Sequence, residues 1–202
     1  MGNPLVKQRV EAANELARYQ ILQRKIRQKM EEYRAELDKI PPRESDLQEL
    51  IVKCDEDRAF YQANRREYEA EERKDFRELA FAAAHPEEPT RQEQIIAEYQ
   101  GFQVILPAHA TKDNPVLCLR RSGNYVVSVG KSDVGLLVRI DNCLEELDKR
   151  LETLREELER LRQRRAFLEK ELAAPEDYAD QILNYQKRLV ELDEQLGVNE
   201  EG

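Results

Sequence analysis

Gly130-Lys131-Ser132 has the residue types that end a phosphate-binding loop. Such a loop binds phosphate through successive backbone amides and the N-terminus of the next helix, and it needs an earlier glycine five residues before its last one. Position 125 is a tyrosine, and the residues after Ser132 look like a strand. The spacing therefore argues against nucleotide binding, and we interpret this tripeptide as a β-turn.

The histidines and cysteines are too scattered for a metal site or a catalytic pair. His85 and His109 have no cysteine or second histidine at the spacing of metal ligands. Cys54, Cys118 and Cys143 are odd in number and far apart, which argues against a disulfide scaffold. No cysteine or serine has a histidine base nearby in the sequence. We expect no catalytic residue, no metal and no cofactor.

Basic side chains gather on segments that are expected to be helical. If two of these segments lie side by side, their cations would form a band that neutralises phosphates. This basic band would contain Arg24, Lys25, Arg27, Arg162, Arg164 and Arg165. The alternative, which we favour, is that these cations pair with the many glutamates at helical spacing.

The composition indicates long helices rather than a compact enzyme. The chain has 202 residues, 40% of them hydrophobic, 37% charged and 6% aromatic. Charged residues average about 25% in soluble domains, and helices that share thin apolar seams tolerate the excess. The net charge of −9 disfavours sequence-independent DNA binding as the main role. There is neither an apolar run of about 18 residues nor an apolar signal core, so we expect a cytoplasmic protein with no membrane partner.

The clearest helical pattern lies near the C-terminus. Apolar residues repeat at intervals of four and three from Ile140 to Leu172, interrupted at Arg165, and the pattern resumes from Tyr178 to Leu196. A sustained heptad keeps one stripe against a partner helix. Pro175 and Gly197 follow the ends of the two stretches, so we expect an antiparallel hairpin of two helices.

Two more helices are predicted in the N-terminal half. An apolar seam runs from Val6 to Ile40, and Pro41-Pro42 is expected to end it. A second helix should begin at Ser45, extend to about residue 81 and fold back on the first. In this arrangement Pro41-Pro42 and Pro175 would lie together at the tip of a stalk.

Between the two helical pairs the pattern changes to short apolar runs separated by Gly, Pro, Asn and Asp. These runs predict antiparallel strands at residues 101–108, 114–121, 124–130 and 135–140, with a hairpin turn at Ser122-Gly123-Asn124. A short helix is expected before them, from Thr90 to Tyr99. The predicted fold is α+β and mostly α, with long antiparallel coiled-coil hairpins of four helices and a small antiparallel β-sheet head between them. The expected parts are 1–98, 99–141 and 142–202.

The head carries three motifs, and its flanks carry further ones. The head motifs are Tyr99, Gly101 and Phe102; Gly130, Asp133 and Gly135; and Arg139, Asp141 and Asn142. They resemble the C-terminal region of the very large helicase–DNA methyltransferase proteins of bacterial integrative and conjugative elements and phages, whose motors are similar to Swi/Snf-type helicases. Gly2-Asn3-Pro4, Glu72-Arg73-Lys74 and the segment 189–196 are similar to that family as well. Phe76-Arg77 departs from its pattern, which has smaller residues there.

The resemblance implies a non-catalytic accessory domain of a longer parent protein, with helicase and methyltransferase motifs upstream and Met1 as an internal start. Such a domain would position DNA, the helicase lobes or a partner protein. Two other functions stay open: a free-standing coiled-coil adaptor or homodimerisation module, and a DNA-binding module that uses the basic band. The candidate interaction residues are Gly101, Phe102, Gly130, Asp133, Gly135, Arg139, Asp141 and Asn142.

The junction between the head and the following helix has its own expectations. Asp141 or Asn142 should cap the helix, with Asn142 and Glu145 spaced as a capping box. Arg139 should pair with Asp133 or Asp141. We favour an architectural role for this junction over a partner-binding role.

Overall fold

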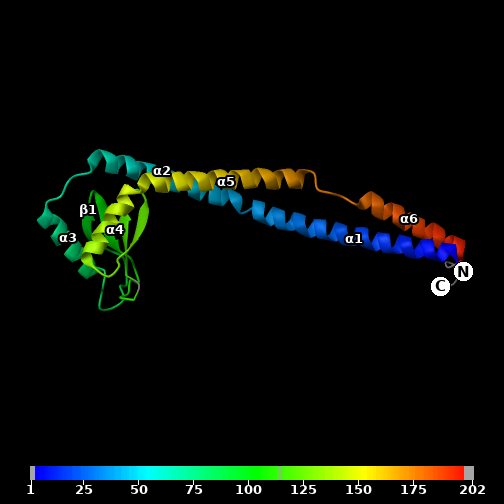
Figure 1. The fold of residues 1–202 in the computed structure, drawn as a ribbon, viewed down its shortest axis with the longest axis horizontal. Helices are drawn as coiled ribbons and strands as arrows, with labels where there is room; N and C mark the ends of the chain where they lie inside the picture. Colours follow the sequence, from blue (N-terminus) through cyan, green and yellow to red (C-terminus); the bar gives the residue numbers. More distant parts are fainter. Residues whose placement is uncertain (1–2, 114, 198–202) are drawn as a thin grey trace. The chain divides into compact units, whose positions relative to one another are not determined.

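The computed structural model describes residues 3–113 and 115–197 and is mostly helical, with one small antiparallel sheet (Figure 1). Met1, Gly2 and Asn114, which belong to the predicted opening motif and second strand, lie outside these ranges. Among the described residues no helix is long and apolar enough to cross a membrane. The elements are α1 (Pro4–Leu37), α2 (Ile40–Asn64), α3 (Ala70–Ala83), β1 (Gln94–Tyr99), β2 (Phe102–Leu106), β3 (Val116–Arg120), β4 (Asn124–Ser128), α4 (Asp133–Glu145), α5 (Leu147–Ala173) and α6 (Ala179–Leu196).

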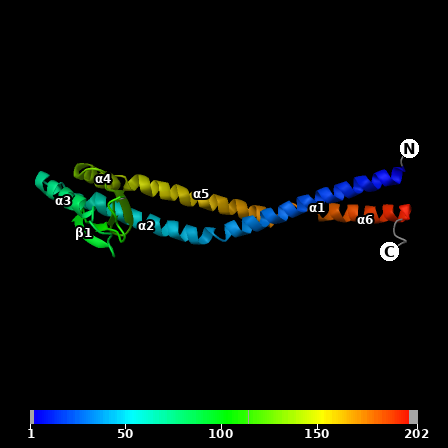
Figure 2. The ribbon, with the colours of Figure 1, turned by 90° about the horizontal axis from the view of Figure 1, so that it is seen from below.

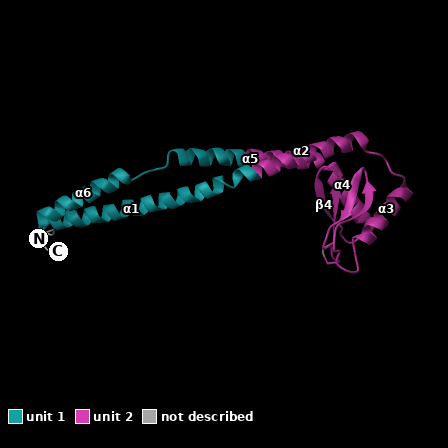
Figure 3. Cartoon of the chain, turned by 180° about the vertical axis from the view of Figure 1, so that it is seen from behind, with its two compact units in different colours: residues 1–42, 161–202 teal, residues 43–160 magenta. Residues whose placement is uncertain are grey.

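The chain divides into two compact units (Figure 3). The first unit contains Met1–Pro42 and Leu161–Gly202, and the second contains Arg43–Arg160. These bounds differ from the three consecutive parts expected from the sequence. The difference arises because the first unit joins the two ends of the chain.

In the first unit α1 lies antiparallel to α6 and to the C-terminal part of α5 (Figures 1 and 2). As the residue numbers of α1 rise, the residue numbers of its contacts fall. Arg9 binds Asp193, Gln23 accepts from the Tyr178 amide at 2.7 Å, and Glu36 binds Arg164. Tyr19 also stacks on Tyr185, with ring centroids 5.7 Å apart. The predicted seam of α1 therefore exists, but its partner is not the helix that follows it in sequence.

The prediction that α1 pairs with the next helix is wrong, because the chain does not fold back on itself at Pro41-Pro42. The interruption falls at Asp38-Lys39, and both prolines lie in the first turn of α2, where a missing amide breaks no helical hydrogen bond. Ser45 is consequently inside α2 rather than at its cap. Pro175 is also placed differently, because it lines a groove with Gln23 and Met30, and Met30 precedes Pro41 by about 16 Å of helix.

In the second unit α2 lies antiparallel to the first part of α5. Arg43 binds Glu157 and Arg58 binds Asp148, while the Cys54 thiol lies 3.7 Å from the Leu147 carbonyl. The sheet has the strand order β1-β2-β3-β4, with every neighbouring pair antiparallel. One face of the sheet forms the core with side chains from the helices. Its buried residues include Phe102, Val104, Leu117, Leu119, Tyr125 and Val127 from the strands and Ala80, Leu136, Ile140 and Leu144 from α3 and α4.

Two predicted elements of the head have the opposite secondary structure. Residues 94–99 form strand β1 rather than part of a helix, and residues 135–140 lie in helix α4 rather than in a strand. α4 begins earlier because the Ser132 hydroxyl accepts from the Gly135 amide at 3.0 Å and caps it. Asn142 is therefore inside a helix, and the capping box predicted there is wrong. The apolar run of α4 buries Leu136, Ile140 and Leu144, which is helical spacing.

The pairing of α2 with α5 predicts a position-dependent cost for one substitution. Leu158 of α5 is 8% exposed, whereas Val52 of α2 is 57% exposed. Leu158→Asp should lower the free energy of unfolding by about 3 kcal/mol, because it puts an unpaired charge into an apolar seam. Val52→Asp should change it by less than about 1 kcal/mol. Urea titrations followed by circular dichroism measure both, and equal effects would show that Leu158 is not in an interface.

Candidate functional site

Two of the predicted motifs meet in the second unit, between β1, α3 and α4. The Tyr99 hydroxyl donates to Asp141 Oδ1 at 2.7 Å, and Arg73 Nη2 donates to Asp141 Oδ2 at 2.8 Å. Arg73 Nη1 also donates to the Tyr99 hydroxyl at 3.2 Å. The carboxylate of α4 thereby holds the end of β1 and the first turn of α3 together. Neither the pairing of Asp141 with Arg139 nor its role as a cap is observed.

The Tyr99 ring is the centre of an aromatic stack. The ring centroid of Tyr68 lies 4.9 Å from that of Tyr99, and the ring centroid of Phe76 lies 4.5 Å from it. Both rings are nearly parallel to the Tyr99 ring. Phe76, which departs from the family pattern, therefore packs directly on a motif residue. Burial, together with the hydrogen bond to Asp141, raises the pKa of Tyr99. The hydroxyl is thus a firmly neutral donor rather than a base.

Gly101 is the second residue of a two-residue turn between β1 and β2. Gln100 has φ 55° and Gly101 φ 78°, and tight hairpins require positive φ at both turn positions. A Cβ on Gly101 would lie 2.5 Å from the Phe60 ring, so the close approach also demands glycine. The Gln100 side chain accepts from the Arg66 amide at 3.1 Å and donates to the Arg66 carbonyl at 2.9 Å. This turn fastens the connection between α2 and α3, and Phe102 after it is fully buried.

The second motif forms the connection from β4 to α4. Gly130 has φ 76°, and a Cβ there would lie 2.4 Å from Arg139 Nη1. Arg139 Nη1 donates to the Ser128 carbonyl at 3.2 Å and to its hydroxyl at 3.0 Å. Asp133 is paired with Arg77, whose Nε lies 2.9 Å from Asp133 Oδ2. The predicted pairing of Arg139 with Asp133 or Asp141 is therefore wrong, since each carboxylate has another arginine.

The remaining residues of this connection do not complete a phosphate site. A helix does follow Ser132, contrary to the strand expected there, but position 125 is a buried tyrosine of β4. Lys131 and Asn142 have exposed side chains, and Gly135 supplies the capped amide of α4. Gly130, Asp133, Gly135 and Arg139 thus define how α4 starts.

Asp57 is the strongest polar centre of the head, and the sequence analysis missed it. Its carboxylate is 0% exposed. It accepts from the Gly123 amide at 2.7 Å, the Ser122 amide at 2.9 Å and the Tyr125 hydroxyl at 2.7 Å, and Arg121 Nη1 lies 3.2 Å away. The predicted turn at Ser122-Gly123-Asn124 is confirmed, but nothing in the local sequence of α2 marks Asp57 as its acceptor.

The basic band does not form as one cluster. Arg164 binds Glu36 through two bonds of 2.7 Å, and Arg165 Nε lies 2.9 Å from Glu169. Arg27 instead lines the groove beside Pro175 and Asp177, about 13 Å of helix from Glu36. Arg24 and Lys25 lie still earlier on α1, and Arg162 lies on α5 with an exposed side chain. Pairing with glutamates is thus observed for Arg164 and Arg165.

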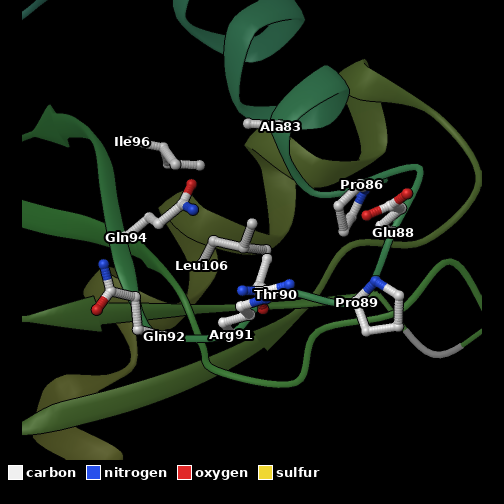
Figure 4. Close-up of a pocket in the computed structure, with 10 residues that line it drawn as sticks. All are labelled: Ala83, Pro86, Glu88, Pro89, Thr90, Arg91, Gln92, Gln94, Ile96 and Leu106. Atoms are coloured by element: carbon white, nitrogen blue, oxygen red, sulfur yellow. The ribbon is translucent and has the colours of Figure 1, made fainter.

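The head has a cleft beside β1 of about 610 Å³ (Figure 4). Ile96 and Leu106 are apolar lining residues, and Pro86 and Pro89 come from the segment before β1. Thr90 is used internally, since its hydroxyl donates to the Pro107 carbonyl at 2.8 Å and accepts from the Ala110 amide at 3.0 Å. Glu88, Arg91, Gln92 and Gln94 also line the cleft, so its lining is mixed polar and apolar.

The described cysteines are buried or half-buried. In the described part of the chain, no three His, Cys, Asp or Glu side chains are grouped to hold a metal ion. Burial raises the pKa of the Cys54, Cys118 and Cys143 thiols. All three therefore favour the thiol over the reactive thiolate.

The Asp57 centre predicts a large difference between two substitutions. Asp57→Ala leaves two amides, a buried hydroxyl and Arg121 without their acceptor, and should cost about 3 kcal/mol or more of unfolding free energy. Tyr125→Phe removes one donor and should cost about 1 kcal/mol. Chemical denaturation of both variants measures the ratio. If Asp57→Ala costs no more than Tyr125→Phe, Asp57 is not what fixes the turn.

The two tyrosine–aspartate pairs predict loss of stability at alkaline pH. Burial, with the hydrogen bond to Asp57, raises the pKa of Tyr125 as it does that of Tyr99. Above about pH 10 an unfolded tyrosine ionises while these two stay neutral, so stability present below that pH falls as pH rises. The slope should reach about 1.4 kcal/mol per pH unit for each tyrosine. Unfolding free energies of the native chain and of a Tyr99→Phe, Tyr125→Phe variant test this, and equal slopes would refute it.

The motif residues of the head thus meet at two joints, one around Asp141 and one at the start of α4. At both joints the described hydrogen bonds are made between residues of the protein itself. In comparisons with known proteins, the chain matches no family model, no curated protein and no solved structure. Its function has to be inferred from its own residues and their geometry.

Proposed function

We propose that the chain is a non-catalytic accessory domain of a helicase-like, cytoplasmic DNA-processing protein of a mobile element. In this proposal the helices of the first unit form an antiparallel coiled coil, and the head binds the helicase lobes. The heptad spacing of α1, α5 and α6 and their antiparallel side-chain pairs support the coiled coil. The head motifs support the link to helicases through their resemblance.

The face of the sheet that lies away from the core carries the proposed docking function. Four apolar residues form a row across it in register: Ile95 pairs with Ile105, Ile105 with Cys118, and Cys118 with Val126. None of the four belongs to the core cluster that the helices share with the other face, although Ile105 is itself only 1% exposed. Ile95 is 62% exposed and Val126 is 70% exposed. The two exposed ends of the row, Ile95 and Val126, are the side chains available to a protein partner.

Charge favours a protein partner over DNA on this face. Arg120 of β3 is bound by both oxygens of Glu93, at 2.7 and 2.9 Å. This contact lowers the pKa of Glu93, so the pair stays charged and mutually neutralised at neutral pH. Interfaces with DNA are much more positively charged than interfaces between proteins. The resemblance names the helicase lobes of the same parent as the protein partner.

A binding experiment with the helicase lobes tests the proposal. The reading frame that encodes the chain, or an adjacent gene, should encode helicase motifs, and those lobes should co-purify with the chain. Val126→Asp should weaken the binding at least tenfold, because it places a charge in the apolar row, and should leave the melting temperature unchanged. Val138→Asp is the matched control, since Val138 of α4 is 50% exposed and lies outside the row.

Three results would contradict the proposal. The first is the absence of helicase motifs from the gene and its neighbours. The second is equal binding of the lobes by the Val126→Asp variant and the native chain. The third is salt-dependent DNA binding by the isolated chain that Arg24→Ala and Arg27→Ala abolish, which would favour the DNA-binding alternative.

A further inference from the structure

The first unit has a second apolar stripe on each of two paired helices. Apart from the seam between α1 and α6, Val6, Val10 and Ile21 of α1 are 48–50% exposed, and Leu183 and Val190 of α6 are 47% and 53% exposed. Val6 and Val10 line a shallow groove of about 780 Å³. The outer apolar face is defined here as Val6, Val10, Ala13, Ala17, Ile21, Leu183 and Val190.

Helical geometry places both stripes on one side of the pair. At 3.6 residues per turn, each stripe lies roughly 130° around its helix from the seam, in the same sense on α1 and α6. Because the helices are antiparallel, this equal rotation turns both stripes to the same side. The opposite side is marked by Gln8 and Arg188, which are bonded at 3.1 Å. The residue numbers of two facing residues on α1 and α6 add up to about 200, as for Arg9 with Asp193. Val10 therefore lies beside Val190.

The interior of this unit is thin. Its described residues that are buried and apolar are Ala12, Met30, Ile40, Leu168 and Leu192. A helical pair buries only one stripe of each helix, and stable helical domains usually add a further layer. The outer apolar face has the position that such a layer would cover.

We propose that the outer apolar face binds the same face of a second copy of this chain, so that two α1–α6 pairs form a four-helix bundle. A two-fold pairing brings each surface patch against itself, so it tolerates no charge of one sign at the centre. From Val6 to Ile21 the stripe on α1 contains no charged residue. Two ion pairs lie at its margin, Arg9 with Asp193 and Lys7 with Glu11, and each is neutral as a whole.

The size of the face agrees with a weak dimer. The 18 residues Pro4–Ile21 span about 27 Å, and two packed helices are about 20 Å wide, which gives about 540 Å² on each copy. The total of about 1,100 Å² just exceeds the 1,000 Å² expected of a specific interface. We therefore expect a dissociation constant in the micromolar range. The proposal needs no helicase lobes and stands or falls separately from the proposed function.

Sedimentation equilibrium of the full chain over a range of concentrations tests the proposal. The native chain should show a reversible monomer–dimer equilibrium. A variant with Val10→Glu and Val190→Glu should raise the dissociation constant about 100-fold or more, because like charges would face each other across the two-fold axis. Val52→Glu is the control: Val52 is 57% exposed on α2 in the other unit, and its substitution should leave the dimer unchanged.

Circular dichroism melting shows whether the variants fold. If the variant with Val10→Glu and Val190→Glu does not fold, a variant with Val10→Gln and Val190→Gln is used in its place. A native chain that is monomeric at every concentration overturns the proposal. A dimer that both face variants leave intact overturns it too, as does one that Val52→Glu weakens equally. Dissociation by the face variants alone supports it.

Discussion

A carboxylate that is removed from water must find its hydrogen-bond donors inside the protein. The head is organised around one such group, Asp57, and around Asp141, which is 22% exposed and bonded in a similar way. Asp57 of α2 reaches the turn after β3, and Asp141 of α4 reaches the end of β1. Each accepts from a buried tyrosine hydroxyl and lies beside an arginine. A helix attached in this way cannot slide along the sheet without leaving a charge unpaired, so the two aspartates fix the register of the helical layer on the strands.

Local patterns predicted most of the elements, and contacts between distant residues decided the rest. The central strands, the first long helix and the turn at Ser122-Gly123-Asn124 follow from apolar spacing and turn residues and are observed. The second predicted helix is instead divided at residues 65–69 into α2 and α3. Residues 135–140 read as a strand because their apolar run is short and β-branched. The serine cap three residues earlier made them a helix. The partner of α1 could not be read from the seam, because a heptad shows that a helix has a partner but not which one.

The candidate site divides in the same way. The resemblance selected Tyr99, Gly101, Gly130 and Asp141, which the structure places at the joints of the head. Their roles depended on groups far away in the sequence: Arg73 for Asp141, Phe60 for Gly101 and Arg139 for Gly130. Asp57 was missed because, in the sequence of a highly charged helix, an aspartate that will be buried cannot be distinguished from those that stay on the surface. Only the amides that face it distinguish it.

The pairing of the two ends of the chain has a consequence for biosynthesis. Arg9 and its partner Asp193 are 184 residues apart. At about 5–20 residues per second, α1 leaves the ribosome about 10–40 s before that partner is made. During this interval the apolar seam of α1 has no native partner, while the second unit, Arg43–Arg160, is synthesised. The nascent chain therefore carries a helix with an unpaired apolar seam until α6 has been made.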